Sequence, residues 1–568
     1  MFKSNILYAI VILTSFIITI FHLHYVKEIG FRGDANYYIE YSARLFENNF
    51  EPLMFRPFYY LYGNLAQKIF GLNDYSIKIF NIILFGINGV LTFIISKQLF
   101  KNNLISLTPT FLLFSNPGAN LEAATENTTM LSTFLILIFL LFFLYIKKKV
   151  EKKLILYSAL FGFYAAVLFF THEELIIICV FNSLLLINYF ISKRNFIKFL
   201  VIQMATFVSI SLIFILKFAN DSLIKNFISQ ALNVLPKNIN YFIRSKYHNT
   251  DYDIQLSITN LFDYFNKDIL NIFPKFFIPS YFVLLILVVY FILILKNKKK
   301  DENLNILILN LIIYFIVLIL TIRAAPRLFI SYYPIFFIIV VFAVNYIIEI
   351  VLKNNFKPII TFFLFSYIIF NNFFYLFPHE YKNKITQDKL LFNLLNDKIN
   401  NNNKILLLSS IYDAGAGTGA RKKIGDQFTE NYSLSSQVYF GGNAILFRNI
   451  LRFDSDVQDF LSFIKKNKIK YAIFKEEYSE KAYTNNEFEN INKLFADRKK
   501  FIEDKVINKK ENSYLKLYGS PRNELFFINS AIETELIENF SAKKRLINLN
   551  YNDKNFLNEK VYILEFKY

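Results

Sequence analysis

Long apolar runs alternate with two different kinds of connecting segment, and this alternation constrains the fold more than any other feature of the chain. The runs recur between Ile6 and Phe377, and a helix of about 20 apolar residues crosses a bilayer. Every second connection is rich in lysine, whereas the others carry acids and histidines. Because cytoplasmic loops retain Lys and Arg, the pattern predicts a polytopic membrane protein with its N-terminus inside and its acids outside.

The apolar runs predict about eleven membrane-spanning helices. The candidate spans are Ile6–Leu23, Ile77–Ile95, Leu104–Phe114, Met130–Ile146, Leu154–Phe170, Leu175–Ile191, Phe199–Phe218, Phe276–Leu295, Leu304–Ile322, Leu328–Val351 and Ile359–Phe377. Five lysine-bearing connections fall on one side, near residues 97–101, 147–153, 193–198, 296–300 and 353–357. With the N-terminus inside, an odd number of spans places everything after Phe377 outside.

We therefore expect an α-helical polytopic membrane domain and a separate C-terminal extracytoplasmic α/β domain. The membrane domain is residues 1–377, with outer loops at 25–76 and 219–275, and the second domain is residues 378–568. In the second domain, strand-like segments and one helix-like segment alternate, as in α/β folds. The predicted strands are Lys404–Ser409, Tyr471–Phe474, Val561–Phe566 and a segment between Val506 and Tyr518, and the predicted helix is Val457–Lys466.

Composition excludes several classes of protein. The chain has 568 residues, of which 54% are hydrophobic, and this is far from the composition of a soluble enzyme. The net charge of +19 comes from lysines spread over short loops, so it fits membrane topology and anionic headgroups rather than nucleic acid. The single cysteine, Cys179, permits no disulfide within the chain. The first apolar run lacks a cleavage site before His22 and is expected to be a retained signal anchor.

Candidate chemical groups gather at the predicted outer ends of the spans. Asp34 follows the first span, within Phe31-Arg32-Gly33-Asp34-Ala35-Asn36-Tyr37-Tyr38, and Arg56 precedes Pro57 and further aromatic residues. Glu126 opens the fourth span, and His172-Glu173-Glu174 joins the fifth to the sixth. On these residues alone, Asp34 is either a solvated loop carboxylate or a base beside a cation that holds phosphate.

The order and sidedness of these motifs resemble the GT-C glycosyltransferases, in particular the protein O-mannosyltransferase and lipid A aminoarabinose transferase group. The resemblance extends from the early aspartate and Arg56-Pro57 through three later motifs. These are Asn116-Pro117 to Asn127, Thr171 to Glu174, and Pro326-Arg327 to Pro334. One position departs from the pattern: many relatives have a second acid after the loop aspartate, where this chain has Ala35.

The resemblance implies transfer of a sugar from a polyprenyl-phosphate donor to an acceptor on the outer face of the inner membrane. Asp34 would accept the proton of the acceptor hydroxyl, an effect of about 10²–10⁴-fold. Arg56 would contact the donor phosphate, with Arg327, Arg323 and Arg32 as further candidates. The expected substrate-binding residues are Tyr37, Tyr38, Glu126, His172, Glu173 and Glu174. The implied partners are the donor, the bilayer and a glycan, lipid or protein acceptor, without nucleic acid.

Alternatives remain at the level of the sequence. His172 and its neighbouring glutamates could cap helices, contact the acceptor or ligate a divalent cation, although adjacent residues rarely converge on one ion. His22 and His24 are expected to be interfacial anchors. A carrier or flippase would carry charges in mid-span and show repeated halves, which the sequence lacks. A polymerase using a lipid pyrophosphate would not need an aspartate directly after the first span.

Overall fold

The computed structural model describes two compact units. The described residues are 2–26, 35–46, 56–73, 75–100, 102–189, 191–218, 302–320, 329–351 and 357–372, together with short stretches of the C-terminal part. Those stretches are 404–407, 444–446, 462, 464–466, 468–475, 517–519, 524–526, 538, 543–549 and 559–567. The first unit comprises Met1–Lys27, Tyr41–Ile69 and Tyr75–Lys382, and the second comprises mainly Asn383–Tyr568.

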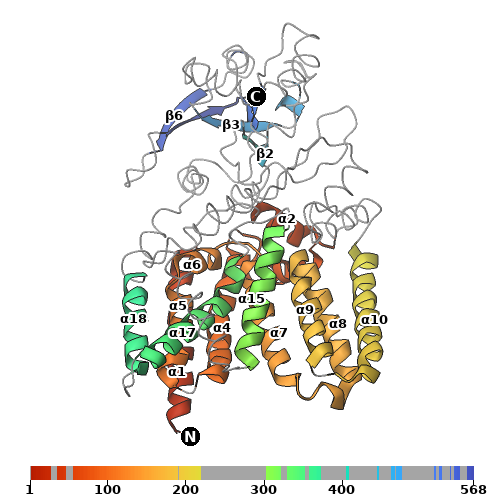
Figure 1. Ribbon diagram of the computed structural model, residues 1–568. Coiled ribbons are helices and arrows are strands. Elements are labelled where there is room, and N and C mark those ends of the chain that lie inside the picture. Colours follow the sequence, from red (N-terminus) through yellow and green to blue (C-terminus); the bar gives the residue numbers. More distant parts are fainter. Residues whose placement is uncertain are drawn as a thin grey trace. The chain divides into compact units, whose positions relative to one another are not determined.

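The N-terminal two thirds of the chain is mostly helical (Figure 1). Its α-helices are α1 (Phe2–Tyr25), α2 (Ala35–Arg44), α3 (Pro57–Phe70), α4 (Ser76–Leu99), α5 (Asn103–Ser115), α6 (Pro117–Ala123), α7 (Thr129–Ile146), α8 (Leu154–Thr171), α9 (Ile176–Tyr189), α10 (Lys193–Phe218), α15 (Glu302–Leu320), α17 (Tyr333–Val351) and α18 (Lys357–Asn371). Single 3-10 turns, η2 (Val150–Lys153), η3 (Glu173–Leu175) and η7 (Ile330–Tyr332), precede α8, α9 and α17.

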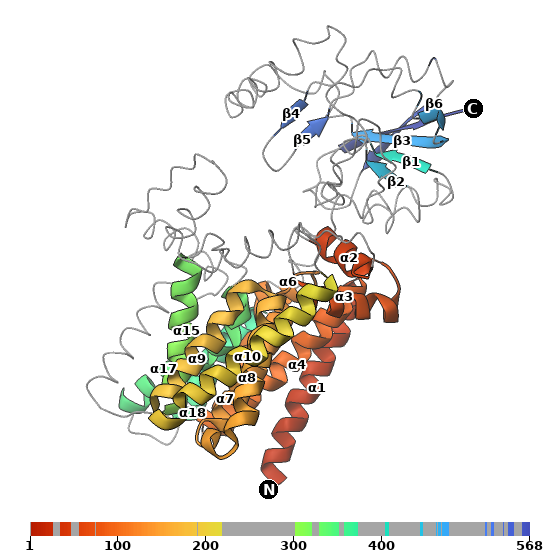
Figure 2. The same ribbon diagram turned by 90° about the vertical axis from the view of Figure 1, so that its right-hand side faces the viewer.

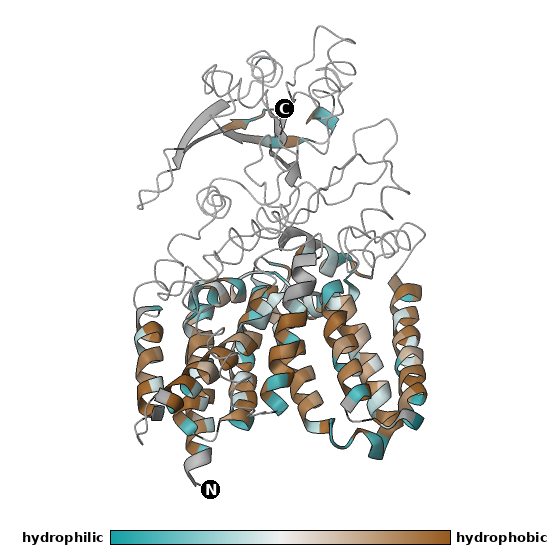
Figure 3. Cartoon of the chain, viewed as in Figure 1, coloured by the Kyte–Doolittle hydropathy of each residue, from teal (hydrophilic) through white to brown (hydrophobic). Residues whose placement is uncertain are grey.

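Six helices in the described part of the chain are long and apolar enough to cross a membrane. They cover Asn5–Tyr25, Ser76–Leu99, Thr129–Ile146, Val150–Thr171, Arg194–Phe218 and Ile330–Ile350, and α5, α15 and α18 contain shorter apolar helices. Large apolar side chains are exposed along α1, α10 and α18, so the outer surface of the bundle is hydrophobic (Figure 3). This is the surface of a membrane protein. The predicted span Phe276–Leu295 lies outside the described residues.

The predicted outer loop at 25–76 contains two helices, α2 and α3, which the loop prediction did not include. Pro57 occupies the first position of α3, where its missing N–H costs nothing and its fixed φ suits a helix. Tyr59, Tyr60, Gly63 and Ala66 are buried along one face of α3. The segment was predicted as a loop because it is too short and too polar to span a bilayer.

The two ends of the helical bundle differ in chemistry. At one end Lys147, which follows α7, pairs with Glu302 at the start of α15 at 2.8 Å. Close to α8 at this same end, Glu151 accepts a 2.6 Å hydrogen bond from the backbone N–H of Ser192. Because α8 begins at this end and finishes at Thr171, the residues after Thr171 lie at the opposite end. That opposite end holds the groups described below as the candidate site.

Close helix contacts and buried amides hold the bundle together. A Cβ atom on Gly162 of α8 would lie 2.3 Å from the backbone oxygen of Gln203 on α10, so these two helices approach as only glycine allows. Asn182 of α9 and Asn310 of α15 exchange side-chain hydrogen bonds of 2.6 and 3.1 Å. Such interhelical polar contacts fix the register of helices in an apolar surrounding.

The second unit contains a mixed five-stranded sheet with strand order β2-β1-β3-β7-β6 (Figure 2). The strands are β1 (Lys404–Leu407), β2 (Ala444–Leu446), β3 (Ile469–Lys475), β6 (Lys543–Leu549) and β7 (Glu559–Glu565). The strand β1 is parallel to β2 and β3, while β7 is antiparallel to β3 and β6. A separate antiparallel pair joins β4 (Leu517–Gly519) to β5 (Glu524–Phe526).

Three predicted strands of this unit are confirmed, at β1, β3 and β7, and the segment ending at Tyr518 overlaps β4. The strands β2, β5 and β6 were not predicted. The strand β2 has only three residues, too few for a recognisable pattern. The strand β6 begins with Lys-Lys-Arg, so its sequence lacks the apolar residues expected at the start of a strand. The predicted helix Val457–Lys466 is described only at residues 462 and 464–466.

Candidate functional site

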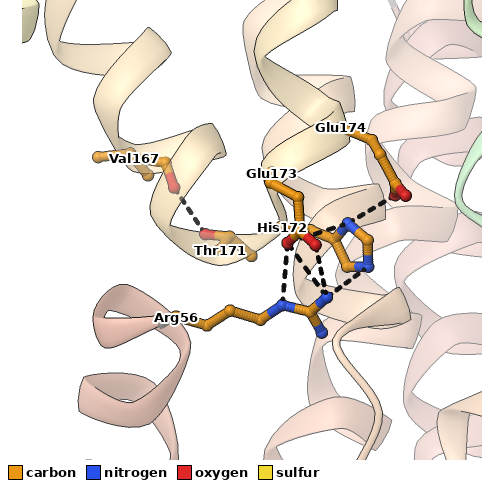
Figure 4. A network of polar contacts seen from close by, with 6 residues as sticks. All are labelled: Arg56, Val167, Thr171, His172, Glu173 and Glu174. Carbon is orange, nitrogen blue, oxygen red and sulfur yellow. Dashed lines mark hydrogen bonds and ion pairs between the residues drawn. The ribbon is translucent and has the colours of Figure 1, made fainter. Parts of the chain in front are cut away.

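Arg56 stands at the start of α3 with its side chain directed at the turn between α8 and α9 (Figure 4). Its carbonyl accepts the first hydrogen bond of the helix, from Tyr60 N–H at 3.0 Å, so the backbone of Arg56 is fixed by the helix that follows. Only 3% of Arg56 is exposed. A guanidinium buried to this degree needs counter-charge and hydrogen-bond acceptors around it.

Glu173 supplies that counter-charge. Arg56 Nε lies 3.2 Å and Nη2 lies 3.1 Å from Glu173 Oε2, and Nη2 is also 3.4 Å from Oε1. Two nitrogens of one guanidinium therefore point at a single carboxylate, which is itself 2% exposed. Paired contacts of this kind are strong and directional, and a phosphate offers the same arrangement of oxygens.

His172 also contacts Arg56. Its Nε2 lies 3.1 Å from Arg56 Nη2, and a guanidinium can only donate. The hydrogen-bond network therefore assigns a neutral His172 with a lone pair on Nε2 and the proton on Nδ1. Nδ1 is 2.8 Å from Glu174 Oε2, close but not in line for a hydrogen bond.

Glu174 is fully buried, and no donor among the described residues forms a hydrogen bond with its oxygens. With both carboxyl groups ionised and His172 neutral, the network of Arg56, His172, Glu173 and Glu174 carries one positive and two negative charges. The carboxylates lie in the turn η3, just before the N-terminus of α9, where the helix dipole favours negative charge.

A second buried ion pair lies at the same end of the bundle. Lys78, in the first turn of α4, has its Nζ 3.1 Å from Glu126 Oε1, and both side chains are fully buried. Glu126 lies in the turn between α6 and α7. Glu126 is among the site residues predicted from the sequence, whereas Lys78 is not. The available signal was a lone lysine in the first turn of an otherwise apolar span.

Hydrogen bonds hold the turn that carries Glu126. The hydroxyl of Tyr59 donates to the Glu126 carbonyl at 2.6 Å, and Asn81 Nδ2 donates to the Thr125 carbonyl at 2.7 Å. Tyr59 follows Arg56 by three residues, so one turn of α3 contacts both the α8–α9 turn and the α6–α7 turn. The two ion pairs are thus fixed from the same short helix.

Glu122 is a further acid in this region. Its Oε2 accepts hydrogen bonds of 3.0 Å from Asn127 Nδ2 and from Thr129 Oγ1. Ser331, in the turn η7, approaches the Thr129 carbonyl at 3.5 Å and so brings the start of α17 to the same place. Four connections of the bundle therefore converge here: the start of α3, the α6–α7 turn, the α8–α9 turn and η7.

The structure brings together some predicted site residues and not others. Arg56, His172 and Glu173 are in direct contact, Glu174 adjoins His172, and Glu126 pairs with Lys78 instead. Tyr37 and Tyr38 lie in α2, and Tyr38 is buried. The remaining predicted site residues, Asp34, Arg32, Arg323 and Arg327, lie outside the described residues.

The expectation that His22 is an interfacial anchor is wrong. Its side chain is fully buried, and Nε2 lies 2.7 Å from Asn120 Oδ1. Asn120 also donates to the Phe114 carbonyl at 2.7 Å, so His22 ties α1 to the junction of α5 and α6. For a histidine near the end of a span, the sequence does not distinguish a side chain that faces lipid headgroups from one that packs against another helix.

Within the ranges that the structure describes, no group of three or more His, Cys, Asp or Glu side chains is arranged to hold a metal ion. In the His172–Glu174 turn, Arg56 occupies both the Glu173 carboxylate and the Nε2 atom of His172. Each of these atoms would otherwise be a metal ligand. In this structure the turn therefore binds the guanidinium of Arg56.

No protein-family model matches this sequence, and no curated protein matches it significantly. Solved structures similar to the chain include those of two proteins. One is ArnT from Cupriavidus metallidurans bound to undecaprenyl phosphate, at a TM-score of 0.49 and 11% identity, covering 92% of this chain and 97% of that one. The other is an oligosaccharyltransferase from Archaeoglobus fulgidus, solved with Zn and sulfate, at a TM-score of 0.48 and 10% identity, covering 92% and 73%.

The same archaeal enzyme, AglB, in complex with an inhibitory peptide and a dolichol-phosphate, matches at a TM-score of 0.45 and 11% identity, covering 84% of this chain and 70% of that one. ArnT and AglB are members of the GT-C superfamily, the group that the sequence motifs resemble. About one residue in ten is identical in these pairs.

Proposed function

We propose that the chain is a membrane glycosyltransferase that takes a sugar from a polyprenyl-phosphate donor and passes it to an acceptor at the outer face of the inner membrane. The observation that carries the proposal is the buried Arg56, held by paired contacts on a carboxylate at one end of a bundle of apolar helices. Arg binds phosphate with the same fork geometry. A lipid-borne phosphate is the anion that reaches such a place from the bilayer.

Asp34 is the proposed general base. Its carboxylate accepts the proton of the acceptor hydroxyl while the hydroxyl oxygen bonds to the anomeric carbon and the bond from that carbon to the phosphate oxygen breaks. The products are the glycosylated acceptor and free polyprenyl phosphate. Because a phosphate is a weak base, its departure needs positive charge rather than a general acid. Arg56 is the proposed source of that charge, and Arg327, Arg323 and Arg32 are further candidates.

In the structure Glu173 contacts two nitrogens of Arg56, so in this proposal the donor phosphate takes the place of the Glu173 carboxylate. The exchange is favourable only if the displaced carboxylate finds another cation. His172 is placed for this, because its Nδ1 is 3.9 Å from Glu173 Oε2. In this proposal Glu173 holds the guanidinium in place between turnovers, and His172 balances the charge while the donor is bound.

The proposal includes the topology predicted from the sequence. Residues 1–377 form a GT-C-type membrane domain of about eleven spans with a cytoplasmic N-terminus, and residues 378–568 form an extracytoplasmic domain. Tyr37, Tyr38, Glu126 and Glu174 are the proposed contacts of sugar and acceptor. The support is the separation of charge along the helices: the lysines near 147–153 lie at one end of α8, and the buried acids lie at the other.

Mass spectrometry of cell-envelope glycans tests the proposed function. Cells without the gene are complemented either with the wild-type chain or with Asp34→Asn, which removes the base but keeps the size of the side chain. We expect one glycan linkage to disappear on deletion, to return with the wild-type chain and to stay absent with Asp34→Asn. Membrane levels of the two proteins serve as the control. An unchanged glycan profile after deletion would contradict the proposed activity.

A further inference from the structure

A cluster of two lysines and two aromatic rings lies at the rim of the helical bundle, away from Arg56. Its members are Phe46, Lys68, Lys217 and Phe218, referred to below as the Phe46 cluster. Lys68 Nζ is 5.3 Å and Lys217 Nζ is 5.6 Å from the centre of the Phe46 ring. The rings of Phe46 and Phe218 lie 6.0 Å apart. Figure 2 shows the last turn of α10, which carries Lys217, beside α3, which carries Lys68.

The cluster concentrates positive charge. Two ammonium groups from different helices share one aromatic ring, and neither forms an ion pair with a carboxylate in the described part of the chain. Each ammonium gains from the ring face, but the two repel each other. An anion placed between them would be attracted by both lysines.

Exposed apolar side chains continue from each lysine along its helix. On α3, Leu65 and Ile69 are exposed on the face that carries Lys68, and on α10, Ile213 lies one turn before Lys217. Leu216, next to Lys217, is 81% exposed. Because α10 is long and apolar enough to span a membrane, we expect Ile213 and Leu216 to face lipid, with the two ammonium groups at the border of the apolar region and Leu65 and Ile69 of α3 beside them. A phospholipid has a matching arrangement, with a charged headgroup at the border and apolar acyl chains below it.

We propose that the Phe46 cluster binds the phosphate headgroup of an anionic phospholipid, whose acyl chains lie along the exposed faces of α3 and α10. The site is separate from Arg56: both lie on α3, but the twelve residues from Arg56 to Lys68 correspond to about 18 Å of helix. The Phe46 cluster is proposed to bind a lipid rather than a soluble phosphate. The reason is that exposed apolar side chains of α3 and α10 lie next to both lysines and can contact acyl chains. This site stands independently of the proposed transferase activity.

The absence of tryptophan from the chain makes the test direct. Phe46→Trp introduces a single fluorophore that keeps an aromatic face for both lysines. The full-length variant is placed in phosphatidylcholine nanodiscs containing either brominated phosphatidylglycerol or brominated phosphatidylcholine, and quenching is measured. Since a lysine near an anionic surface contributes about 1 kcal/mol, two lysines should give at least about tenfold tighter apparent binding of phosphatidylglycerol.

Three further variants in the Phe46→Trp background separate the possible results. Lys68→Gln with Lys217→Gln should abolish the preference, whereas Lys68→Arg with Lys217→Arg should keep it. Lys149→Gln with Lys152→Gln removes two charges at the opposite end, where Lys149 also lies over a ring, at 4.0 Å from Tyr145, and should leave the preference unchanged.

Equal quenching by the two brominated lipids in Phe46→Trp overturns the proposal, as does a preference that survives the double glutamine substitution. Loss of the preference in the Lys149 and Lys152 control also overturns it, since the effect would then be one of net charge. Inorganic phosphate at millimolar concentration should not compete. If it removes the preference, the cluster is a site for free anions and not for a lipid.

Discussion

At the scale of single residues, Arg56 and Glu173 form the contact on which the proposed chemistry depends. Glu173→Gln leaves a buried guanidinium without its counter-charge, which typically costs about 3–5 kcal/mol. We expect a marked fall in the thermal unfolding temperature in detergent. Undecaprenyl phosphate should restore much of the loss, because its phosphate supplies the missing negative charge to Arg56.

The matched control is Glu174→Gln, which changes the adjacent buried carboxylate, whose Oε2 lies 2.8 Å from His172 Nδ1. Undecaprenyl phosphate should stabilise Glu174→Gln no more than the wild-type protein. Equal stabilisation of both variants would show that the lipid acts elsewhere, and the exchange of Glu173 for phosphate would have to be abandoned.

Lys78 and Glu126 allow a test of how buried charges are balanced. Lys78→Met leaves the carboxylate of Glu126 buried without its ammonium partner, and we expect a loss of stability of about 3–5 kcal/mol. Lys78→Met combined with Glu126→Leu removes both charges and keeps the volume, so its unfolding temperature should return close to the wild-type value. Thermal unfolding in detergent measures both variants. A double variant as unstable as Lys78→Met alone would contradict the pairing.

The sequence predicts which charged residues are unusual at this end of the bundle but not how they pair. Arg56, Glu126 and the His172–Glu174 turn stand out because they interrupt apolar or aromatic surroundings. Their partners are set by the packing of α3 against two distant turns, a tertiary contact that no local pattern contains. Lys78 was overlooked because a lysine in the first turn of a span reads as a residue that reaches for the interface.

At the scale of the elements, α8 and α10 show the closest approach of a described helical glycine to the backbone of another helix. A Cβ on Gly162 would lie 2.3 Å from the Gln203 carbonyl oxygen and 2.8 Å from Thr206 Cβ. Because a backbone oxygen cannot rotate away, Gly162→Ala should force the helices apart and destabilise the protein by about 1–3 kcal/mol. Unfolding in detergent measures the loss.

The adjacent Phe163 is 43% exposed on the surface of α8 and provides the control. Phe163→Ala removes a far larger group and should cost less stability than Gly162→Ala, because it leaves the α8–α10 contact intact. The opposite ranking of the two variants would mean that the close approach of these helices has been misjudged.

Helices formed by long apolar runs could be predicted from the sequence. Helices whose formation depends on packing against other elements could not. The predictions for α1, α4, α7, α8 and α10 are confirmed, since each run is long enough to span a bilayer by itself. The short predicted run Leu104–Phe114 also matches a helix, α5, although it contains Pro109. In contrast, α3 is half polar and was expected to be part of a loop, because it depends on neighbours for burial and a single-sequence pattern does not show neighbours.

At the scale of the whole molecule, the loop lysines of residues 147–153 lie at one end of α8, and the buried acids Glu173 and Glu174 lie at the other. The sequence predicted this separation because loop charges sort by side during membrane insertion. The order of strands in the C-terminal sheet could not be predicted in this way. It depends on which strands meet, and residues as distant as those of β1 and β7 flank β3 in the same sheet.

Turnover of a synthetic polyprenyl-phosphate sugar by the purified full-length protein tests the central claim most directly. The measured quantity is free polyprenyl phosphate released in the presence of an envelope extract as the acceptor source, with a set of donors that differ in the sugar. We expect the wild-type protein to release the carrier from one donor. Asp34→Asn should be slower by about 10²–10⁴-fold, and Arg56→Ala should need a higher donor concentration. Release by Asp34→Asn at the wild-type rate, with a donor dependence unchanged in Arg56→Ala, would contradict the account.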